Sequence, residues 1–539
     1  MAKDPKNSTG RTNAKGKTYG KRNNNYRTER ERADKESAAT SGGKHPHNDP
    51  EWYCRNGQAI KDVASLSFNT ALGADTYLRS PGTSSAFRLS VPGVMAIKTV
   101  PTIGVGSDMY SPANIAARDV YSDVRKANSG SKNYDPADLM IYLLAMDSIY
   151  GFWAWMVRLY GTLRLFSKVN RYVGDVYVMA QGGDPGDLRK NLANFRAYIN
   201  NFAQQVMALS VPTTMTYTVR HMWMYSNMYK DEDTQKAGVY MYVPSGFYMY
   251  NPTISAGAGG LQVANLTCTF DATYPTRIAG TLYNSYSNIM AYGDALLQNV
   301  LGDEDIAIMS GDILKAYGPE GVWKLDYINE DYGVLPVFSE EVLAQIHNTE
   351  FAGRAFGVSD GSGGVSSAAY NVAFAVFQDP NVQSGKLFCE PHVAWGYHLT
   401  YDKILDFWKP NPSPEDVIVA SRNTLYAEKD SGTTAESIRF VKLTATGSEV
   451  CLVPEVFKMS NGVVTETIYW VTDNDGPTAD KIFDYCRFNE APTRLIVDNN
   501  GVGFTYLGEL DTYTSLSGEN VDKMHTTALL SMFGVPYGK

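Results

Sequence analysis

The sequence predicts an α+β protein with an α-rich main domain, a β-containing domain and a disordered, basic N-terminal arm. Three observations predict this organisation. The first fifty residues contain no Leu, Ile, Val, Phe, Trp or Cys. Long apolar segments of helical length begin near residue 135, and short runs rich in β-branched and aromatic residues follow residue 368. The predicted divisions are the arm at 1–50, the main domain at 51–365, the β-containing domain at 366–510 and a C-terminal helix that returns to the main domain at 511–539.

The arm is basic, whereas the rest of the chain is acidic. It carries twelve Lys or Arg and six Asp or Glu, a charge of +6, and the whole chain carries −9, so residues 51–539 carry −15. A segment without apolar residues cannot offset the entropy of ordering, so we expect disorder. Such an arm contacts phosphates by counterion release without reading sequence, although a solvated tail or a targeting signal has the same composition. The residues expected to contact RNA are Lys3, Lys6, Arg11, Lys15, Lys17, Lys21, Arg22, Arg27, Arg30 and Arg32.

Residues 135–160 give the strongest helix signal in the chain. Asp135 can cap the helix, Pro136 suits its first turn, and Asp138 places a negative charge near the positive end of the dipole. The segment is long enough to cross a bilayer. However, Asp147 would lie near the centre of the span at a cost of about 2.5–3.5 kcal/mol. We therefore predict a helix buried in a large core.

The remaining elements of the main domain are less pronounced. A strand-like segment is expected at 239–252, followed by a Gly-rich loop at 254–260, and a second Gly/Ser-rich loop is expected at 357–367. Further helices are predicted at 187–209, 285–301, 339–348 and 519–533.

The β-containing domain is predicted from its strand-forming composition. Strands are expected within 368–400 and 436–472, and Asn461-Gly462 lies between two apolar runs, as in a hairpin turn. Residues 410–416, PNPSPED, contain three prolines and are predicted to be a linker without regular structure.

Two motifs resemble catalytic or nucleotide-binding loops without meeting their requirements. In residues 10–18, GRTNAKGKT, five residues lie between the two glycines, whereas a P-loop has four. No strand is expected before this segment. Residues 357–361 satisfy GxSxG, but they lack the preceding strand and following helix of a nucleophile elbow. We therefore predict that the chain is not an enzyme.

Possible metal ligands are one group of carboxylates and several separate histidines. Carboxylates at 301–312 could hold Mg²⁺ or Ca²⁺, but their spacing matches no EF-hand, and they could instead cap the next helix. These carboxylates are Asp303, Glu304, Asp305 and Asp312. The seven His form no metal-binding pair, and we interpret His221 as a packed or hydrogen-bonded core residue. We expect no metal and no cofactor.

The spacing of the cysteines and the composition of the first residues indicate the cellular compartment in which the protein is found. The five Cys are far apart and form no CxxC pair, which excludes a disulfide framework and a zinc site and favours a reducing compartment. No apolar run follows Met1, so no signal peptide is expected.

Eight runs in the body carry a resemblance to a known family. They are VPGVM at 91–95, SPANIAA at 111–117, YDPADLMIYLLAMDSIY at 134–150, TMTY at 214–217, RHMWM at 220–224, LGDEDIAIMSGDILKAYG at 301–318, LAQIH at 343–347 and MHTTALLSMFGVP at 524–536. In this order they resemble picobirnavirus capsid proteins, which form the coat of small double-stranded RNA viruses. The basic N-terminal arm is also similar to that family's arm.

The resemblance implies a function. Symmetric dimers would build an icosahedral shell around a double-stranded RNA genome, with the arm facing the interior. Residues 51–365 and the C-terminal helix would form the shell domain, and 366–510 an outward-projecting domain. The protein would belong to the virion and assemble in the host-cell cytoplasm. Some family members lose an N-terminal peptide after assembly. Transient host-membrane contact at entry is a further expectation, with 139–160 and the arm as candidates.

Two other classes of protein compete with this interpretation. An RNA-processing or hydrolytic enzyme with a basic tether would need polar groups that converge on one site. An RNA-binding adaptor would carry a reading module, and the sequence has no RRM or KH signature.

Overall fold

A computed structural model defines the fold over most of the body of the chain. The chain divides into two units, Met1–Phe68 and Asn69–Lys539. In the first unit the structure describes residues 55–64, which include helix α2 (Gly57–Ala64). The predicted arm lies outside the described residues. The structure describes residues 55–64, 75–77, 88–90, 94–106, 108–130, 134–169, 171–230, 238–255, 258–266, 283–352, 374–378, 385–394, 402–407, 409–428, 440–460, 463–469, 493–497, 504–509 and 512–536.

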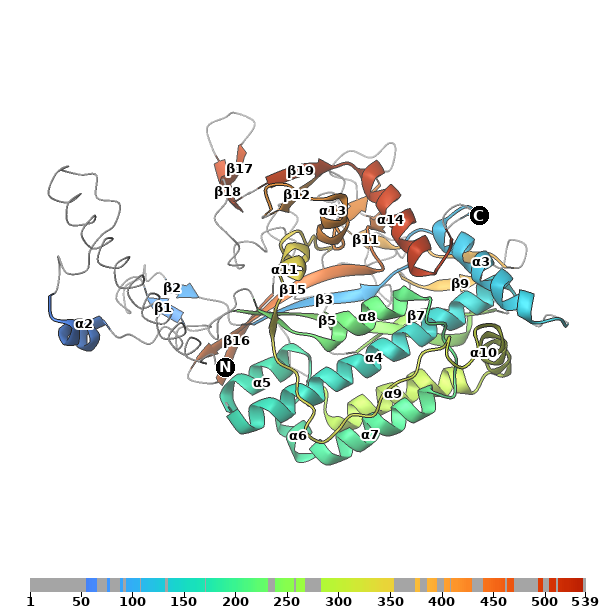
Figure 1. Cartoon of the computed structure of the whole chain (residues 1–539), viewed down its shortest axis with the longest axis horizontal. Coiled ribbons are helices and arrows are strands. Elements are labelled where there is room, and N and C mark those ends of the chain that lie inside the picture. Colours follow the sequence, from blue (N-terminus) through green and yellow to red (C-terminus); the bar gives the residue numbers. More distant parts are fainter. Residues whose placement is uncertain are drawn as a thin grey trace, which may run out of the picture. The chain divides into compact units, whose positions relative to one another are not determined.

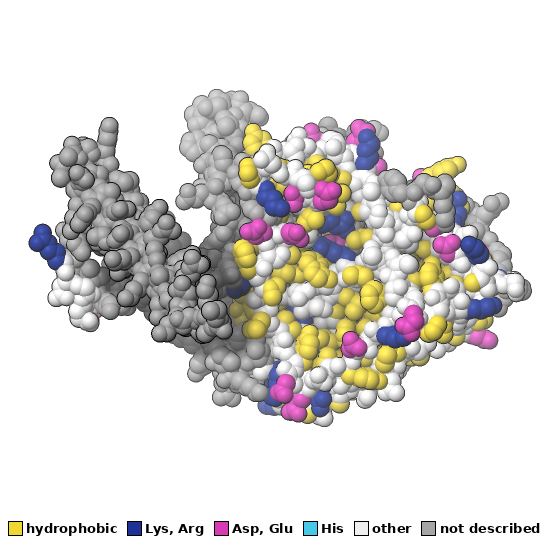
Figure 2. All heavy atoms as spheres, viewed as in Figure 1, with side chains coloured by type: hydrophobic (Ala, Val, Ile, Leu, Met, Phe, Trp, Pro, Cys, Tyr) yellow, Lys and Arg dark blue, Asp and Glu magenta, His cyan; other side chains and the backbone are white. Residues whose placement is uncertain are grey.

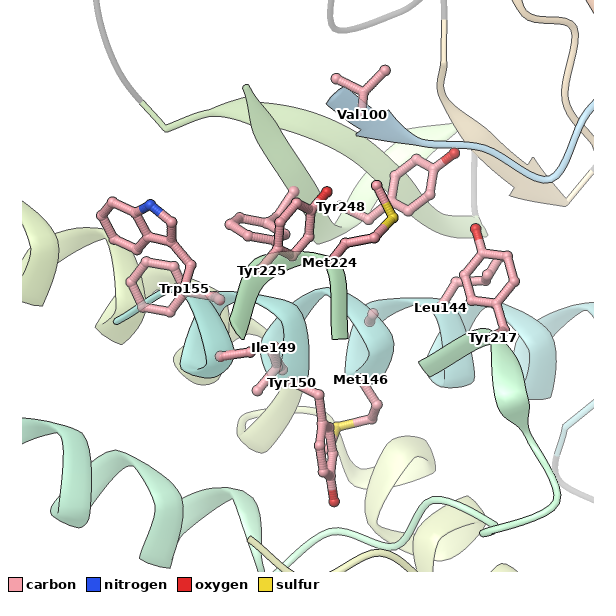
Figure 3. Close-up of a cluster of buried hydrophobic side chains, with 14 of the residues drawn as sticks. Val100, Leu144, Met146, Ile149, Tyr150, Trp155, Tyr217, Met224, Tyr225 and Tyr248 are labelled. Atoms are coloured by element: carbon pink, nitrogen blue, oxygen red, sulfur yellow. The ribbon is translucent and has the colours of Figure 1, made fainter. Parts of the chain in front are cut away.

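The core of the second unit is organised around one long helix, α4 (Pro136–Val169). The described side chains of α4 are buried nearly all round, as expected for a helix that is apolar on every face. Figure 3 shows Met146 and Tyr150 on one side of the helix, with Met224 and Tyr225 packed from another. The buried helix predicted at 135–160 is therefore confirmed, and it continues nine residues further.

Length and composition alone would let Pro136–Arg164 cross a membrane, but its most apolar window is 94% buried inside the protein. Among the helices that pack against α4, five come from residues 171–301 (Figure 1). They are α5 (Arg171–Ala180), α6 (Pro185–Lys190), α7 (Leu192–Val206), α8 (Thr216–Ser226) and α9 (Tyr286–Leu301).

A mixed sheet lies beside this helical layer. Its strand order is β16-β15-β3-β5-β4-β8, with β3 parallel to β5 and antiparallel to β15. Both β3 and β5 are buried along their whole length, as expected for central strands. The strands are β3 (Val94–Pro101), β4 (Tyr229–Lys230), β5 (Val239–Pro244), β8 (Val337–Phe338), β15 (Glu449–Ser460) and β16 (Val463–Tyr469).

The predicted hairpin at 461–462 is confirmed, because Ser460 pairs with Val463. The sheet also joins strands from both sides of residue 365. The predicted boundary at 365/366 therefore does not separate two independent sheets.

The other sheets are smaller. A four-stranded sheet, β10-β9-β7-β6, packs on α4 through β6. Its strands are β6 (Gly246–Ser255), β7 (Ala258–Asn265), β9 (Val376–Gln378) and β10 (Leu387–Phe388). The prediction of a loop at 254–260 is wrong for most of its length, because residues 254–255 belong to β6 and residues 258–260 belong to β7. The remaining strands pair as β1 (Asp75–Tyr77) with β2 (Arg88–Ser90), β14 (Phe440–Ala445) with β11 (His392–Ala394) and β13 (Leu425–Ala427), β12 (Lys403–Phe407) with β19 (Thr512–Leu516), and β17 (Thr493–Val497) with β18 (Phe504–Glu509).

Most predicted helices are present, with changes at their ends. The segment 187–209 forms two helices, α6 and α7, which meet at Asn191. The helices predicted at 285–301, 339–348 and 519–533 are confirmed as α9, α11 (Glu340–His347) and α14 (Gly518–Met532). The helices α2, α3 (Pro112–Ala127), α5 and α8 were not predicted. The α+β class is confirmed.

The prediction of an irregular linker at 410–416 is wrong in its second half, because helix α13 (Pro414–Ala420) begins there. Ser413 Oγ accepts a hydrogen bond from Asp416 N at 3.3 Å, and Asp416 Oδ2 accepts one from Ser413 N at 2.9 Å. This capping box satisfies two backbone donors, and Pro414 stands where a helix needs no N–H.

Candidate assembly surface

One long irregular segment, residues 321–338, crosses the outside of the helical layer between α10 (Glu304–Tyr317) and β8. We call it the strap. Leu325, Ile328 and Val334 are its buried anchors. Asn200 of α7 holds it in place: Ile328 N donates to Asn200 Oδ1 at 2.9 Å, and Asn200 Nδ2 donates to Ile328 O at 3.3 Å. The inner side of the strap is thereby fixed by both packing and hydrogen bonds.

The outer side of the strap is apolar at its C-terminal end, residues 332–338, whereas the residues before it include the exposed side chains of Lys324, Asp326 and Asp331. Tyr327, Leu335, Val337 and Phe338 are 56%, 63%, 45% and 40% exposed. Residues 332–338, YGVLPVF, contain no charged side chain. The strap crosses the face drawn in Figure 1, and Figure 2 shows hydrophobic side chains gathered on that face. Exposed apolar residues that cluster in this way mark interaction surfaces.

The strap ends in β8, an edge strand. Within the described residues β8 pairs with β4 alone, in parallel, and it is the last strand of the six-stranded sheet. Both of its side chains are exposed, although successive side chains of a strand point to opposite faces. Proteins usually protect such edges with charged residues, bulges or proline. Here Pro336 precedes the strand, but the strand itself is Val-Phe.

An ionic cluster in the interior joins α8 to β15 and α11. Arg220 of α8 donates from Nε to Glu449 Oε1 at 3.0 Å and from Nη1 to Gln345 Oε1 at 3.1 Å. Its guanidinium also lies 4.9 Å from the centre of the Trp223 ring. Burial alone would raise the pKa of Glu449, but Arg220, Arg422 and other neighbouring donors outweigh it and lower that pKa to about 2. Glu449 is therefore charged in the interior.

A second buried pair lies next to this cluster. Asp147 Oδ2 of α4 is 2.8 Å from Nδ1 of His221 on α8, and both side chains are almost completely buried. Burial opposes protonation of His221, yet the adjacent carboxylate raises the pKa of this histidine above its ordinary value. The prediction that His221 is a hydrogen-bonded core residue is confirmed.

Further buried pairs cross the predicted domain boundary. His347 Nε2 of α11 lies 2.7 Å from Asp406 Oδ2 of β12, and Lys403 Nζ lies 3.1 Å from Glu350 Oε1. Buried pairs add little net stability, but they penalise any arrangement in which a partner is missing. These contacts connect β12, which follows residue 365, to α11 and Glu350, which precede residue 365.

The carboxylates at 301–312 do not converge on one point. Asp303 caps α10, and its Oδ1 accepts hydrogen bonds from Asp305 N at 2.9 Å and Ile306 N at 3.2 Å. Asp312 instead accepts hydrogen bonds from Arg125 at 3.1 Å and Tyr134 Oη at 2.7 Å. No group of three or more His, Cys, Asp or Glu within the described residues could hold a metal ion. The capping interpretation is confirmed for Asp303.

A cavity of about 240 Å³ lies beside this helix start. Its polar lining includes Asp138, Asp303 and the hydroxyl of Tyr250, which donates to Asp303 Oδ2 at 2.9 Å. These acidic groups are thus engaged within the protein. The P-loop-like residues 10–18, the GxSxG residues 357–361 and all ten predicted RNA-contacting residues of the arm lie outside the described residues.

Sequence reasoning did not find the strap or the Arg220–Glu449 pair. The uncharged run YGVLPVF, which lies between two helices, was an available signal for the strap. Arg220 and Glu449 are 229 residues apart, and no local pattern relates them.

An apolar outer segment and an open sheet edge are typical of a subunit that associates with other protein chains. Comparison with known proteins identifies the kind of assembly. The sequence model of the family described as "Picobirnavirus, Capsid protein" matches residues 52–434. The chain belongs to the picobirnavirus capsid protein family.

Two individual proteins illustrate the similarity. The chain is 29% identical over 575 aligned positions to the capsid protein precursor of human picobirnavirus, with 99% of this chain and 98% of the relative covered. The X-ray crystallographic structure of the picobirnavirus capsid matches with a TM-score of 0.68 and 22% identity, covering 90% of this chain and 98% of that chain. This structural match shows the shared fold. The protein is a viral capsid component with a structural role, and it is part of the virion.

Proposed function

We propose that this capsid protein forms symmetric dimers, which assemble into an icosahedral shell around a double-stranded RNA genome. The observation that carries the proposal is the similarity to a capsid protein precursor, which covers 99% of this chain. The exposed apolar strap supports it, because a subunit that works alone gains nothing from such a surface. Assembly in the host-cell cytoplasm is consistent with Cys389 and Cys451, which are free and buried thiols.

The arm is proposed to face the interior and contact RNA. It carries a charge of +6 on a chain whose remainder carries −15. Lys and Arg in an unstructured segment bind phosphates through counterion release, which is independent of sequence and sensitive to salt. The modest charge per arm favours loose contact with the genome over tight condensation. The acidic body would repel RNA from the wall and leave it mobile.

The division into shell and projection is also a proposal. Residues 51–365 and the C-terminal helix would form the shell domain. Parts of 366–510 belong to the larger sheets, because β15 pairs with β3 and β9 pairs with β7. The projection would therefore be formed by the other parts of 366–510.

Of the two candidate segments for host-membrane contact at entry, the arm is the one that we favour. Residues 139–160 lie in α4, where they are buried. Their exposure would require the core to open.

Electron microscopy of the purified full-length chain, combined with an assay for nuclease-protected RNA, tests the proposal. Uniform closed particles that hold protected RNA are the expected result. A monodisperse monomer or small oligomer across several salt and pH conditions would contradict assembly.

Deletion of residues 1–50 tests the arm separately. We expect particles that protect less RNA, and we expect the salt dependence of RNA binding to weaken. Packaging equal to that of the full-length chain, with the same salt dependence, would exclude a role for the arm.

A further inference from the structure

We propose that the outer side of the strap, together with the open edge of β8, binds the same surface of a second copy of this chain. In this contact β8 pairs antiparallel with its equivalent about a twofold axis, and the two six-stranded sheets become continuous. The inference rests on the proposed self-assembly and specifies where one self-contact lies.

The first argument is the unpaired backbone. A strand at a sheet edge presents N–H and C=O groups that another strand can bind. When the same strand from two identical chains pairs with itself, the operator is a twofold axis and the pairing is antiparallel. In β8 neither residue carries a charge that would oppose this approach.

The second argument is the chemistry on both faces of the strand. Val337 and Phe338 point to opposite faces and are 45% and 40% exposed, and Leu335 just before them is 63% exposed. A second strand with the same residues would cover apolar side chains on both faces simultaneously. Burial of apolar area is the main favourable contribution to most protein association.

The third argument concerns charge. Between Tyr332 and Ser339 the strap has no ionisable group other than the tyrosine itself. Its nearest upstream carboxylates, Glu330 and Asp331, lie 3.9 Å and 3.0 Å from Arg164 of the same chain. Along 332–338 itself two copies can therefore approach without bringing like charges together, and the exposed carboxylates nearest to β8 in sequence on its other side are Glu340 and Glu341 of α11.

The fourth argument concerns the occupant. The arm has no Leu, Ile, Val, Phe or Trp in its fifty residues, so it cannot supply an apolar counterpart. Residues 231–237, DEDTQKA, which connect β4 to β5, are equally unsuitable. A family whose members form capsids provides many copies of the strap itself. Of these three candidates, a second copy is the occupant whose apolar chemistry fits the surface.

Cross-linking of assembled full-length protein tests the contact directly. Val337→Cys and Phe338→Cys variants would be treated with an oxidant or a short bismaleimide and run on a denaturing gel. We expect at least one of them to give a covalent dimer. Leu314→Cys, whose parent side chain is 43% exposed on α10, is the matched control and should match the wild-type chain. Absence of dimer above the wild-type level in both strap variants would overturn the proposal, and so would a cross-link within one chain.

A charge variant provides an independent readout. We expect Val337→Asp/Phe338→Asp to lower the yield of particles at least tenfold, with the circular dichroism spectrum and thermal midpoint of the dissociated chain unchanged. Assembly equal to that of the wild type would overturn this inference and leave the proposed function intact. Failure of the wild type itself to assemble would contradict the proposed function. If the charge variant does not fold, the cross-linking result decides.

Discussion

The carboxylate of Asp147, in the middle of α4, lies 2.8 Å from Nδ1 of His221 on α8. This contact explains how the longest apolar helix of the chain accommodates an acidic residue in the core. Within a membrane, the carboxylate would be costly. Within this core it has a titratable partner on a neighbouring helix, and α4 and α8 are fixed in register.

Replacement of Asp147 should destabilise the fold in a pH-dependent way. Burial raises the pKa of Asp147, and Asp147 raises the pKa of His221 above its ordinary value of about 6.5. The pair therefore contributes where both side chains are charged, and its contribution is lost as pH rises through the raised pKa of His221 and also as pH falls through the raised pKa of Asp147. We expect Asp147→Asn to lower the free energy of unfolding by about 3–5 kcal/mol near about pH 6. The loss should be smaller at alkaline pH. Urea unfolding of the dissociated chain, followed by circular dichroism at several pH values, measures it.

Asp326→Asn is the matched control for that experiment, because Asp326 is an exposed carboxylate. It should change the free energy of unfolding by less than about 0.5 kcal/mol. An Asp147→Asn variant as stable as the wild type at every pH would show that the pair has no role in the fold.

Replacement of Glu449 should show a different pH dependence. Its pKa is lowered from an ordinary 4.5 to about 2, so its contribution is present above about pH 4.5 and is lost as pH falls toward 2. We expect Glu449→Gln to cost about 3–5 kcal/mol at neutral pH, because Arg220 and Arg422 would lose their buried counter-charge. The difference from the wild type should shrink in acid. A constant difference across the acid range would contradict the assigned role of the charge.

A glycine after β3, Gly104, packs against the C-terminal helix and should not tolerate a larger side chain. Gly104 has a positive φ of 68°, and a Cβ at this position would collide with the imidazole of His525 in α14. We expect Gly104→Ala to destabilise the chain by more than about 1–2 kcal/mol, the cost of the backbone conformation alone. Thermal unfolding measures the change.

The control for this substitution is Gly311→Ala. Gly311 lies in α10, is exposed, and has open space around its missing Cβ. Alanine there should stabilise the helix by about 0.5–1 kcal/mol. If both substitutions shifted the thermal midpoint in the same direction, the packing of Gly104 on His525 would not explain the result.

Features with local causes could be predicted from the sequence. The helix α4 combines a proline in its first turn, an acidic first turn and a long, mostly apolar run, all within one segment. The β15–β16 hairpin was likewise indicated by Asn461-Gly462 between apolar runs. In both cases the residues that specify the element lie within it.

Features that depend on distant contacts could not be predicted. Helix α8, TYTVRHMWMYS, is rich in β-branched and aromatic residues with modest helix propensity, and its packing on α4 overrides that preference. The partner of Arg220 lies 229 residues away. Likewise, β15 joins β3 in the main sheet, although composition alone placed it in a separate domain.

The start of α13 gives a final prediction, because it separates local capping from proline content. The prolines at 410–416 suggested an irregular linker, but Ser413 and Asp416 form a capping box that starts a helix at Pro414. We expect Ser413→Ala to lower the free energy of unfolding by about 1 kcal/mol, because a backbone donor loses its partner. Ser413→Asp should retain most of the stability, since a carboxylate also caps and favours the positive end of the helix dipole. Thermal unfolding of the three proteins measures this order, and equal midpoints for all three would show that α13 begins without help from its cap.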